Sequence, residues 1–210
     1  MFREILNKNQ QELLPLIKVF SKNHYLVGGT AIALQIGHRE SIDFDLFTAN
    51  KKIKRRRIRR IISESGFSSY PVLYEDDDQM HIVLNDVKLT FFNYMYSIPA
   101  KVDFEGVIKM PSLLDLAAMK ALALGGRAKW KDYTDLYFLF KNHVTFRQVA
   151  NRAAELFGGA FNAKLFREQL TYYKDVNYSE EVVFMPDKNV EKETIEELLT
   201  DIATRPINLA

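Results

Sequence analysis

The stretch that most constrains the fold of this chain runs from Tyr25 to Phe47, where a short apolar run meets two adjacent glycines. The run Tyr25-Leu-Val27 predicts a buried strand that stops at Gly28-Gly29. Adjacent glycines let the backbone turn sharply and leave no Cβ in the way of a ligand. We expect Thr30 to cap a short helix over Ala31–Ile36. A helix that starts just after paired glycines offers free backbone N–H groups to a phosphate.

A second strand, expected over Ile42–Phe47, carries Asp43 and Asp45. Side chains alternate along a strand, so the two carboxylates share one face and their apolar neighbours, Ile42 among them, take the other. Two neighbouring carboxylates repel each other unless a cation lies between them. Oxygen ligands of this kind suit Mg²⁺, which usually completes its shell with substrate phosphates and water.

The pattern Gly28-Gly29-Thr30-Ala31 followed by His38-Arg39-x-Ser41-x-Asp43-x-Asp45 resembles the nucleotidyltransferase superfamily. It is most similar to the AbiEii-type toxins of bacterial abortive-infection and type IV toxin–antitoxin systems. A bare Asp-x-Asp occurs often by chance, but the glycine turn at this spacing and the Arg-x-Ser between them make the match specific. The alternative is a glycine-rich turn with two solvated aspartates.

A second block continues the resemblance to AbiEii-type proteins. It consists of Ser112-Leu-Leu-Asp-Leu, the helical Lys120, and Arg127 followed by Lys131-Asp132-Tyr-Thr-Asp135-Leu. Lys120 lies in an apolar segment, where a lone ammonium needs an anion nearby, and a triphosphate at the glycine turn would provide one. Lys131 and Asp135 are i, i+4 neighbours on a helix, so a structural salt bridge is the alternative for that pair.

The resemblance covers nearly the whole chain and implies an α/β (α+β) fold. A nucleotidyltransferase-like mixed sheet in the N-terminal half, residues 1–108, is packed on a helical C-terminal half, residues 109–210. Within the first half, Gln79–Leu84 and Val87–Tyr96 are rich in β-branched and aromatic residues, and Asn85-Asp86 between them predicts a tight hairpin turn. The expected helices are 2–22, 51–65, 113–124, 131–140, 145–157, 163–174 and 193–202.

The superfamily usually places a third carboxylate on a strand in the hairpin region, where this chain has Thr90. A threonine offers a hydroxyl but no negative charge. We therefore expect one Mg²⁺, or Mn²⁺ in its place, held by Asp43 and Asp45 rather than a complete two-metal site.

The activity that the resemblance implies is transfer of a nucleoside monophosphate from an NTP to an acceptor hydroxyl, with release of pyrophosphate. It implies catalytic roles for Asp43, Asp45, Lys120 and Asp132, where Asp132 either acts as the base or positions Lys120. The implied nucleotide-binding residues are Gly28, Gly29, Thr30, Arg39, Ser41, Arg127 and Lys131.

The implied acceptor is RNA, a tRNA 3′ end, and the implied partner is a cognate antitoxin protein. Two alternatives stay open at this point. The acceptor could be a protein or a small molecule, or the chain could bind nucleotide without turning it over.

Composition bears on location and on charge. The 210 residues include no cysteine, no run long enough to span a membrane and no secretion-signal pattern, so we expect a cytoplasmic protein with no membrane partner. The net charge is only +2, yet eight of the ten residues from Lys51 to Arg60 are basic. This segment is either a solvated helix face or a track for an RNA backbone beside the active cleft.

Overall fold

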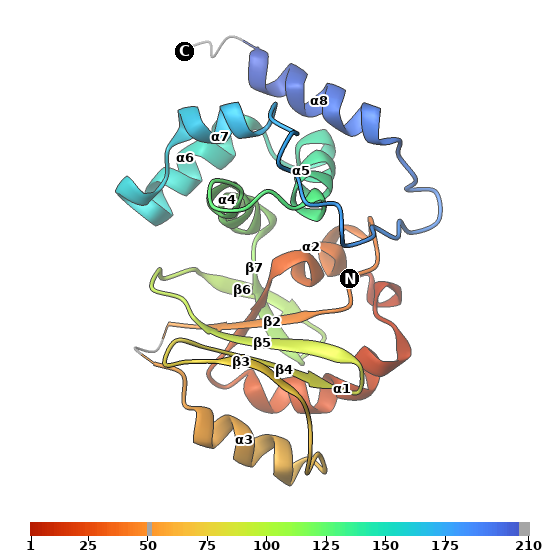
Figure 1. Ribbon diagram of the computed structural model, residues 1–210, viewed down its shortest axis with the longest axis vertical. Helices are drawn as coiled ribbons and strands as arrows, with labels where there is room; N and C mark the ends of the chain where they lie inside the picture. Colours follow the sequence, from red (N-terminus) through yellow and green to blue (C-terminus); the bar gives the residue numbers. More distant parts are fainter. Residues whose placement is uncertain (50–51, 206–210) are drawn as a thin grey trace. The chain divides into compact units, whose positions relative to one another are not determined.

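The computed structural model describes residues 1–49 and 52–205 and comprises two compact units, Met1–Ser112 and Leu113–Ala210 (Figure 1). The first unit carries the β-sheets, and the second is built from helices. Lys51, part of the basic segment, lies outside the described residues. Within the described ranges no helix combines the length and the apolar character that crossing a membrane requires.

The first unit contains a mixed five-stranded sheet with the order β1-β2-β5-β4-β3, together with a separate two-stranded sheet, β6-β7. In the larger sheet β2 and β5 run parallel, and the other neighbours are antiparallel. The elements are η1 Arg3–Ile5, α1 Lys8–Phe20, β1 Tyr25–Val27, α2 Gly28–Ile36, β2 Phe44–Thr48, α3 Arg55–Glu64, β3 Val72–Glu75, β4 Gln79–Leu84, β5 Val87–Asn93, β6 Ala100–Phe104 and β7 Ile108–Pro111. The mixed sheet expected for this part of the chain is confirmed.

One face of the larger sheet is apolar and fully buried. Its central side chains, all 0% exposed, are Phe44, Leu46, Met80, Ile82, Leu89 and Phe91. From α1, Phe20 packs edge-on against Phe91, with ring centroids 4.8 Å apart. Helix α3 buries Ile58 and Ile62 on the same side of the sheet, where Ile58 and Phe20 line one pocket (Figure 1). Because Asp45 alternates with Phe44 and Leu46, it points to the opposite face from α1 and α3.

The hairpin between β4 and β5 turns at Asn85-Asp86, as predicted. Both residues have positive φ, 48° and 58°, which is the requirement of a type I′ turn and a backbone region that Asn and Asp tolerate better than most residues. The turn fixes the register in which Leu84 faces Val87 and Met80 faces Phe91.

Three local expectations in the first unit were wrong. Helix α2 begins at Gly28, so Thr30 lies inside it and does not cap it. Strand β2 begins at Phe44, so Asp43 and Ile42 both precede the strand, and Ile42 is 50% exposed. Near the N-terminus the helix starts at Lys8, where Asn7 and Gln10 form a capping box that sets this boundary.

The second unit consists of α4 Leu113–Leu124, α5 Trp130–Asn142, α6 Phe146–Phe157, η2 Gly158–Ala160, α7 Ala163–Gln169 and α8 Lys192–Thr204. All five α-helices occur near their expected positions, but α7 ends at Gln169 rather than Lys174. The Tyr133 hydroxyl of α5 lies 3.0 Å from the carbonyl oxygens of both Gln169 and Tyr172. This tertiary contact holds the chain in a non-helical turn just after α7.

Candidate active site

The glycine turn and the second aspartate are in contact. Gly28 has φ +73°, and a Cβ added there would lie 2.2 Å from Asp45 Oδ2. A Cβ added at Gly29 would lie 2.2 Å from Nη2 of Arg39. Glycine is therefore needed at both positions, for the backbone conformation at Gly28 and for the close approach of a charged side chain at each.

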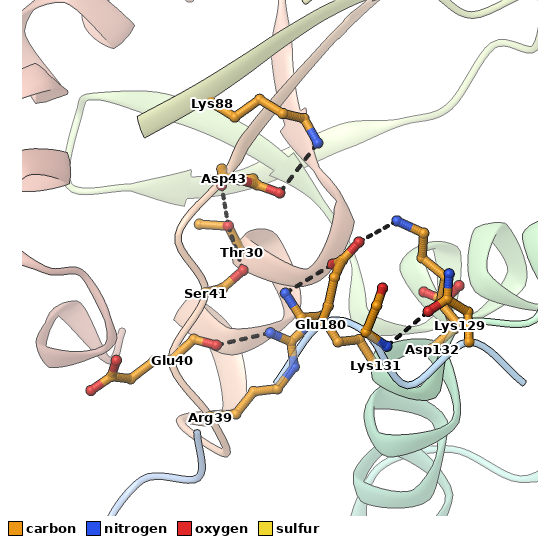
Figure 2. A network of polar contacts seen from close by, with 12 residues as sticks. Thr30, Arg39, Glu40, Ser41, Asp43, Lys88, Lys129, Lys131, Asp132 and Glu180 are labelled. Carbon is orange, nitrogen blue, oxygen red and sulfur yellow. Dashed lines mark hydrogen bonds and ion pairs between the residues drawn. The ribbon is translucent and has the colours of Figure 1, made fainter. Parts of the chain in front are cut away.

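Thr30 and Ser41 connect the turn to the aspartate segment. The Thr30 hydroxyl donates to the backbone carbonyl of Asp43, and it also hydrogen-bonds the Ser41 hydroxyl at 2.8 Å (Figure 2). Arg39 is 2% exposed, and its Nη1 donates to the Glu40 carbonyl at 2.8 Å. These three residues, expected to bind nucleotide, make contacts that fix the backbone on which Asp43 stands.

Asp43 and Asp45 lie on the face of the sheet opposite its apolar side. Asp45 is paired in parallel register with Thr90 of β5, and Thr90 is opposite His81 of β4. Asp43 comes one residue before β2, and its Oδ2 lies 3.5 Å from Nζ of Lys88 (Figure 2). Two carboxylates, one buried threonine and one lysine thus gather at the start of β2.

Thr90, which lies where the resemblance would place a third acid, is the register partner of Asp45 in the neighbouring strand. Among the described residues no group of three or more His, Cys, Asp or Glu side chains could hold a metal ion. The donor set is therefore two aspartates, which fits one hard cation that completes its shell with substrate oxygens and water.

Lys88 and His81 were missed by the sequence analysis. Burial, chiefly, and the charge of Lys88 lower the pKa of His81, while Asp45 raises it. His81 Nε2 lies 2.9 Å from Oε1 of Gln79. Strand alternation could have found Lys88, because it stands two residues before Thr90 and so shares its face.

In the second unit Lys120 is enclosed by carboxylates. Its ammonium hydrogen-bonds Asp132 and lies 2.8 Å from Oδ2 of Asp135. The three side chains are only 9%, 3% and 0% exposed. Lys120 therefore needs no external triphosphate to neutralise it, contrary to our expectation, because two aspartates on α5 already do so.

Asp132 has a second basic neighbour and one oxygen without a hydrogen bond. Arg127 Nε lies 3.7 Å from Asp132 Oδ2, and the arginine side chain is 57% exposed. At that separation the contact is an ion pair rather than a hydrogen bond, and Oδ2 is buried with no hydrogen-bond partner among the described residues.

Lys131 pairs with Glu180 rather than with Asp135. The Lys131 ammonium lies 3.0 Å from Glu180 Oε2, and Lys129 reaches the other carboxylate oxygen at 2.5 Å. Hydrogen bonds from these lysines, that of Lys129 foremost, lower the pKa of Glu180 to about 2. No local pattern marks Glu180, which is far from both lysines in sequence.

A family model described as nucleotidyl transferase AbiEii toxin, type IV TA system, matches residues 16–202. The chain belongs to the AbiEii nucleotidyltransferase toxin family. An uncharacterized protein of Aquifex aeolicus (strain VF5) is 35% identical to this AbiEii protein over 144 residues, which are 66% of this chain and 68% of that protein. The chain is thus a nucleotidyltransferase of the type IV toxin–antitoxin class, as its motifs predicted.

Solved structures share the fold at low sequence identity. MenT4, a nucleotidyltransferase toxin of Mycobacterium tuberculosis H37Rv, superposes with a TM-score of 0.61 at 13% identity, over 93% of this chain and 82% of MenT4. JHP933 of Helicobacter pylori gives 0.56 at 16% identity, over 94% of this chain and 91% of JHP933. These likenesses confirm the fold of the AbiEii protein, while the roles of individual site residues stay predictions.

Proposed function

We propose that this AbiEii nucleotidyltransferase moves a nucleoside monophosphate from an NTP to a hydroxyl of RNA, at a tRNA 3′ end, in a Mg²⁺-dependent reaction. The acceptor oxygen attacks the α-phosphorus, the bond to the β-phosphate breaks, and pyrophosphate leaves. The observation that carries the proposal is the contact between Gly28 and Asp45, which sets a carboxylate against a helix N-terminus.

The carboxylates Asp43 and Asp45 fit a divalent cation. Together they carry two negative charges, and the ammonium of Lys88 lies 3.5 Å from Asp43, which supports a cation at this position. Mg²⁺ suits such a set of one or two carboxylates, and Mn²⁺ can replace it. When bound, the cation would offset the charge that develops on the phosphate oxygens.

The start of α2 fits the phosphates. Val27 at the N-cap position supplies no side-chain hydrogen bond to the start of the helix. N–H groups at a helix start, together with the helix dipole, favour anions. We assign the Gly28–Thr30 backbone to the β- and γ-phosphates.

In the second unit, the roles of Asp132 and Arg127 follow from the ion pairs of Lys120. With its charge balanced by Asp132 and Asp135, Lys120 holds Asp132 in place. Asp132 is either the base for the attacking hydroxyl or, because its side chain is only 3% exposed, a residue that positions Lys120. Arg127, more than half exposed, is the candidate contact for the leaving pyrophosphate.

Incubation of labelled NTPs with total cellular RNA and protein tests the proposal. The expected result is label in RNA of tRNA size, release of pyrophosphate, and loss of both with EDTA. Label in protein would contradict the proposed RNA acceptor. Nucleotide binding without pyrophosphate release would contradict the proposed nucleotidyl transfer. Co-purification with the product of a neighbouring gene tests the antitoxin, and cell fractionation tests the cytoplasmic location.

A further inference from the structure

Lys88 lies on the same face of the sheet as Asp45, and the proposed function assigns it no role in the reaction. The register pairs Phe44 with Leu89 and Asp45 with Thr90, so Lys88 comes level with Asp43 on the face that carries Asp45. Its Nζ lies 3.5 Å from Asp43 Oδ2, and the lysine and aspartate side chains are 38% and 32% exposed. Figure 2 shows the ammonium directed at this carboxylate.

This ion pair can be broken at little cost in stability. A separation of 3.5 Å between partly exposed groups is a long contact, and such pairs contribute little to stability. The opposing strand position is held by Val83, which offers Lys88 no other anion.

A divalent cation would compete with Lys88 for the carboxylate of Asp43. The same carboxylate oxygen is available to the metal and to the ammonium, and the two cations repel each other at short range. Once the metal binds, the freed ammonium has a flexible four-carbon stem and needs a new anion. The phosphates of the nucleotide, bound at the neighbouring helix start, supply that anion.

We propose that Lys88 couples metal binding to nucleotide binding. Its ammonium neutralises Asp43 in the absence of ligand, gives way to the divalent cation, and then contacts a phosphate oxygen of the nucleotide. The inference rests on the proposed metal site and phosphate site. Its consequence is that the metal binds weakly by itself and tightly together with a polyphosphate.

The experiment uses two probes, Mn²⁺ and inorganic tripolyphosphate, and the full chain. Mn²⁺ affinity is measured by electron paramagnetic resonance, and affinity for the Mn²⁺–tripolyphosphate complex by calorimetry. In Lys88→Met we expect Mn²⁺ alone to bind about fivefold more tightly, since a competing cation at a half-exposed site is gone. We expect the complex to bind roughly tenfold more weakly, since a charged contact to phosphate is lost.

Two variants serve as controls. Lys88→Arg keeps the charge and should stay within about twofold of wild type in both measurements. Lys109→Met removes an exposed lysine of β7 in the same unit and should change neither.

The outcomes separate this inference from the proposed function. If Asp43→Asn with Asp45→Asn leaves Mn²⁺ binding unchanged, the metal site itself is wrong. If those changes abolish Mn²⁺ binding but Lys88→Met alters neither affinity, only the Lys88 inference is overturned. Tighter Mn²⁺ binding in Lys88→Met with an unchanged affinity for the complex also overturns it, because Lys88 would then be a simple counterion.

Discussion

Replacing Lys120 by methionine should strongly destabilise the second unit. Methionine keeps a long, unbranched side chain but leaves Asp132 and Asp135, 3% and 0% exposed, without their main counterion. Removing one partner of a buried ion pair typically costs 3–5 kcal/mol. Arg127 remains 3.7 Å from Asp132 but is largely exposed, so it offsets only a small part. We expect a loss of about 3 kcal/mol, the lower end of that range.

Urea unfolding followed by circular dichroism measures this loss. With a typical slope of about 2 kcal/mol per molar urea, the midpoint should fall by about 1.5 M. Lys164→Met on α7, where the side chain is 86% exposed, is the matched control and should leave the midpoint unchanged. The triple variant with Asp132→Asn and Asp135→Asn added should regain most of the stability, since no charge is then left unpaired. A loss below about 1 kcal/mol in Lys120→Met would refute the buried ion-pair cluster.

Three further predictions concern single features of the fold. Gly28→Ala should weaken Mn²⁺ binding and cost about 1–2 kcal/mol in urea unfolding, because its Cβ collides with Asp45 and its φ is positive; unchanged Mn²⁺ affinity would contradict this. The depressed pKa of Glu180, about 2 against an ordinary 4.5, makes its ion pairs stabilising above pH 4.5. Glu180→Gln should therefore destabilise at pH 7, by a difference that shrinks as the pH falls from 4.5 toward 2. In the described part of the chain the α3 segment has three exposed cations without an ion pair, namely Lys54, Arg56 and Arg57. Changing all three to Gln should lower the slope of log RNA affinity against log salt by up to about 2, and an unchanged slope would make this helix a solvated face.

The basic helix α3 does not lie where the sequence predicted. Helix α3 packs on the apolar face of the sheet, opposite Asp45. It therefore does not run beside Asp45, as the predicted track along the active cleft would require. Three of its arginines are paired with acids: Arg55 with Asp77 at 3.3 Å, Arg59 with Glu75 at 2.6 Å and Arg60 with Glu64 at 3.6 Å.

The features that the sequence predicted well are those with a local cause. The hairpin turn needs positive φ at two adjacent residues, and Asn85-Asp86 predicts it because both residue types tolerate that conformation. Amphipathic periodicity located the helices of the second unit. Strand β3, Val72–Glu75, escaped prediction as a separate strand because all four of its side chains are exposed and show no alternation.

The features that were misjudged depend on long-range partners. Thr30 looks like a helix cap in sequence, but its hydroxyl bonds Asp43 and Ser41 across the loop that joins α2 to β2. Lys120 was correctly identified as a buried cation in need of an anion, and only the tertiary structure shows that the anions are on α5. The pairing of Lys131 with Glu180 similarly has no signal in the spacing of the chain.

The central claim is that Asp43 and Asp45 hold the cation that nucleotidyl transfer requires. The most direct test is pyrophosphate release with Mg²⁺ and NTP in wild type, Asp43→Asn and Asp45→Asn, each checked by urea unfolding without metal. Each variant should keep its stability to within about 1 kcal/mol, since only partly exposed carboxylates change. Each should lose roughly a thousandfold in rate, equivalent to about 4 kcal/mol of transition-state stabilisation. Near-normal Mg²⁺-dependent release in either folded variant would contradict the assignment of the metal site.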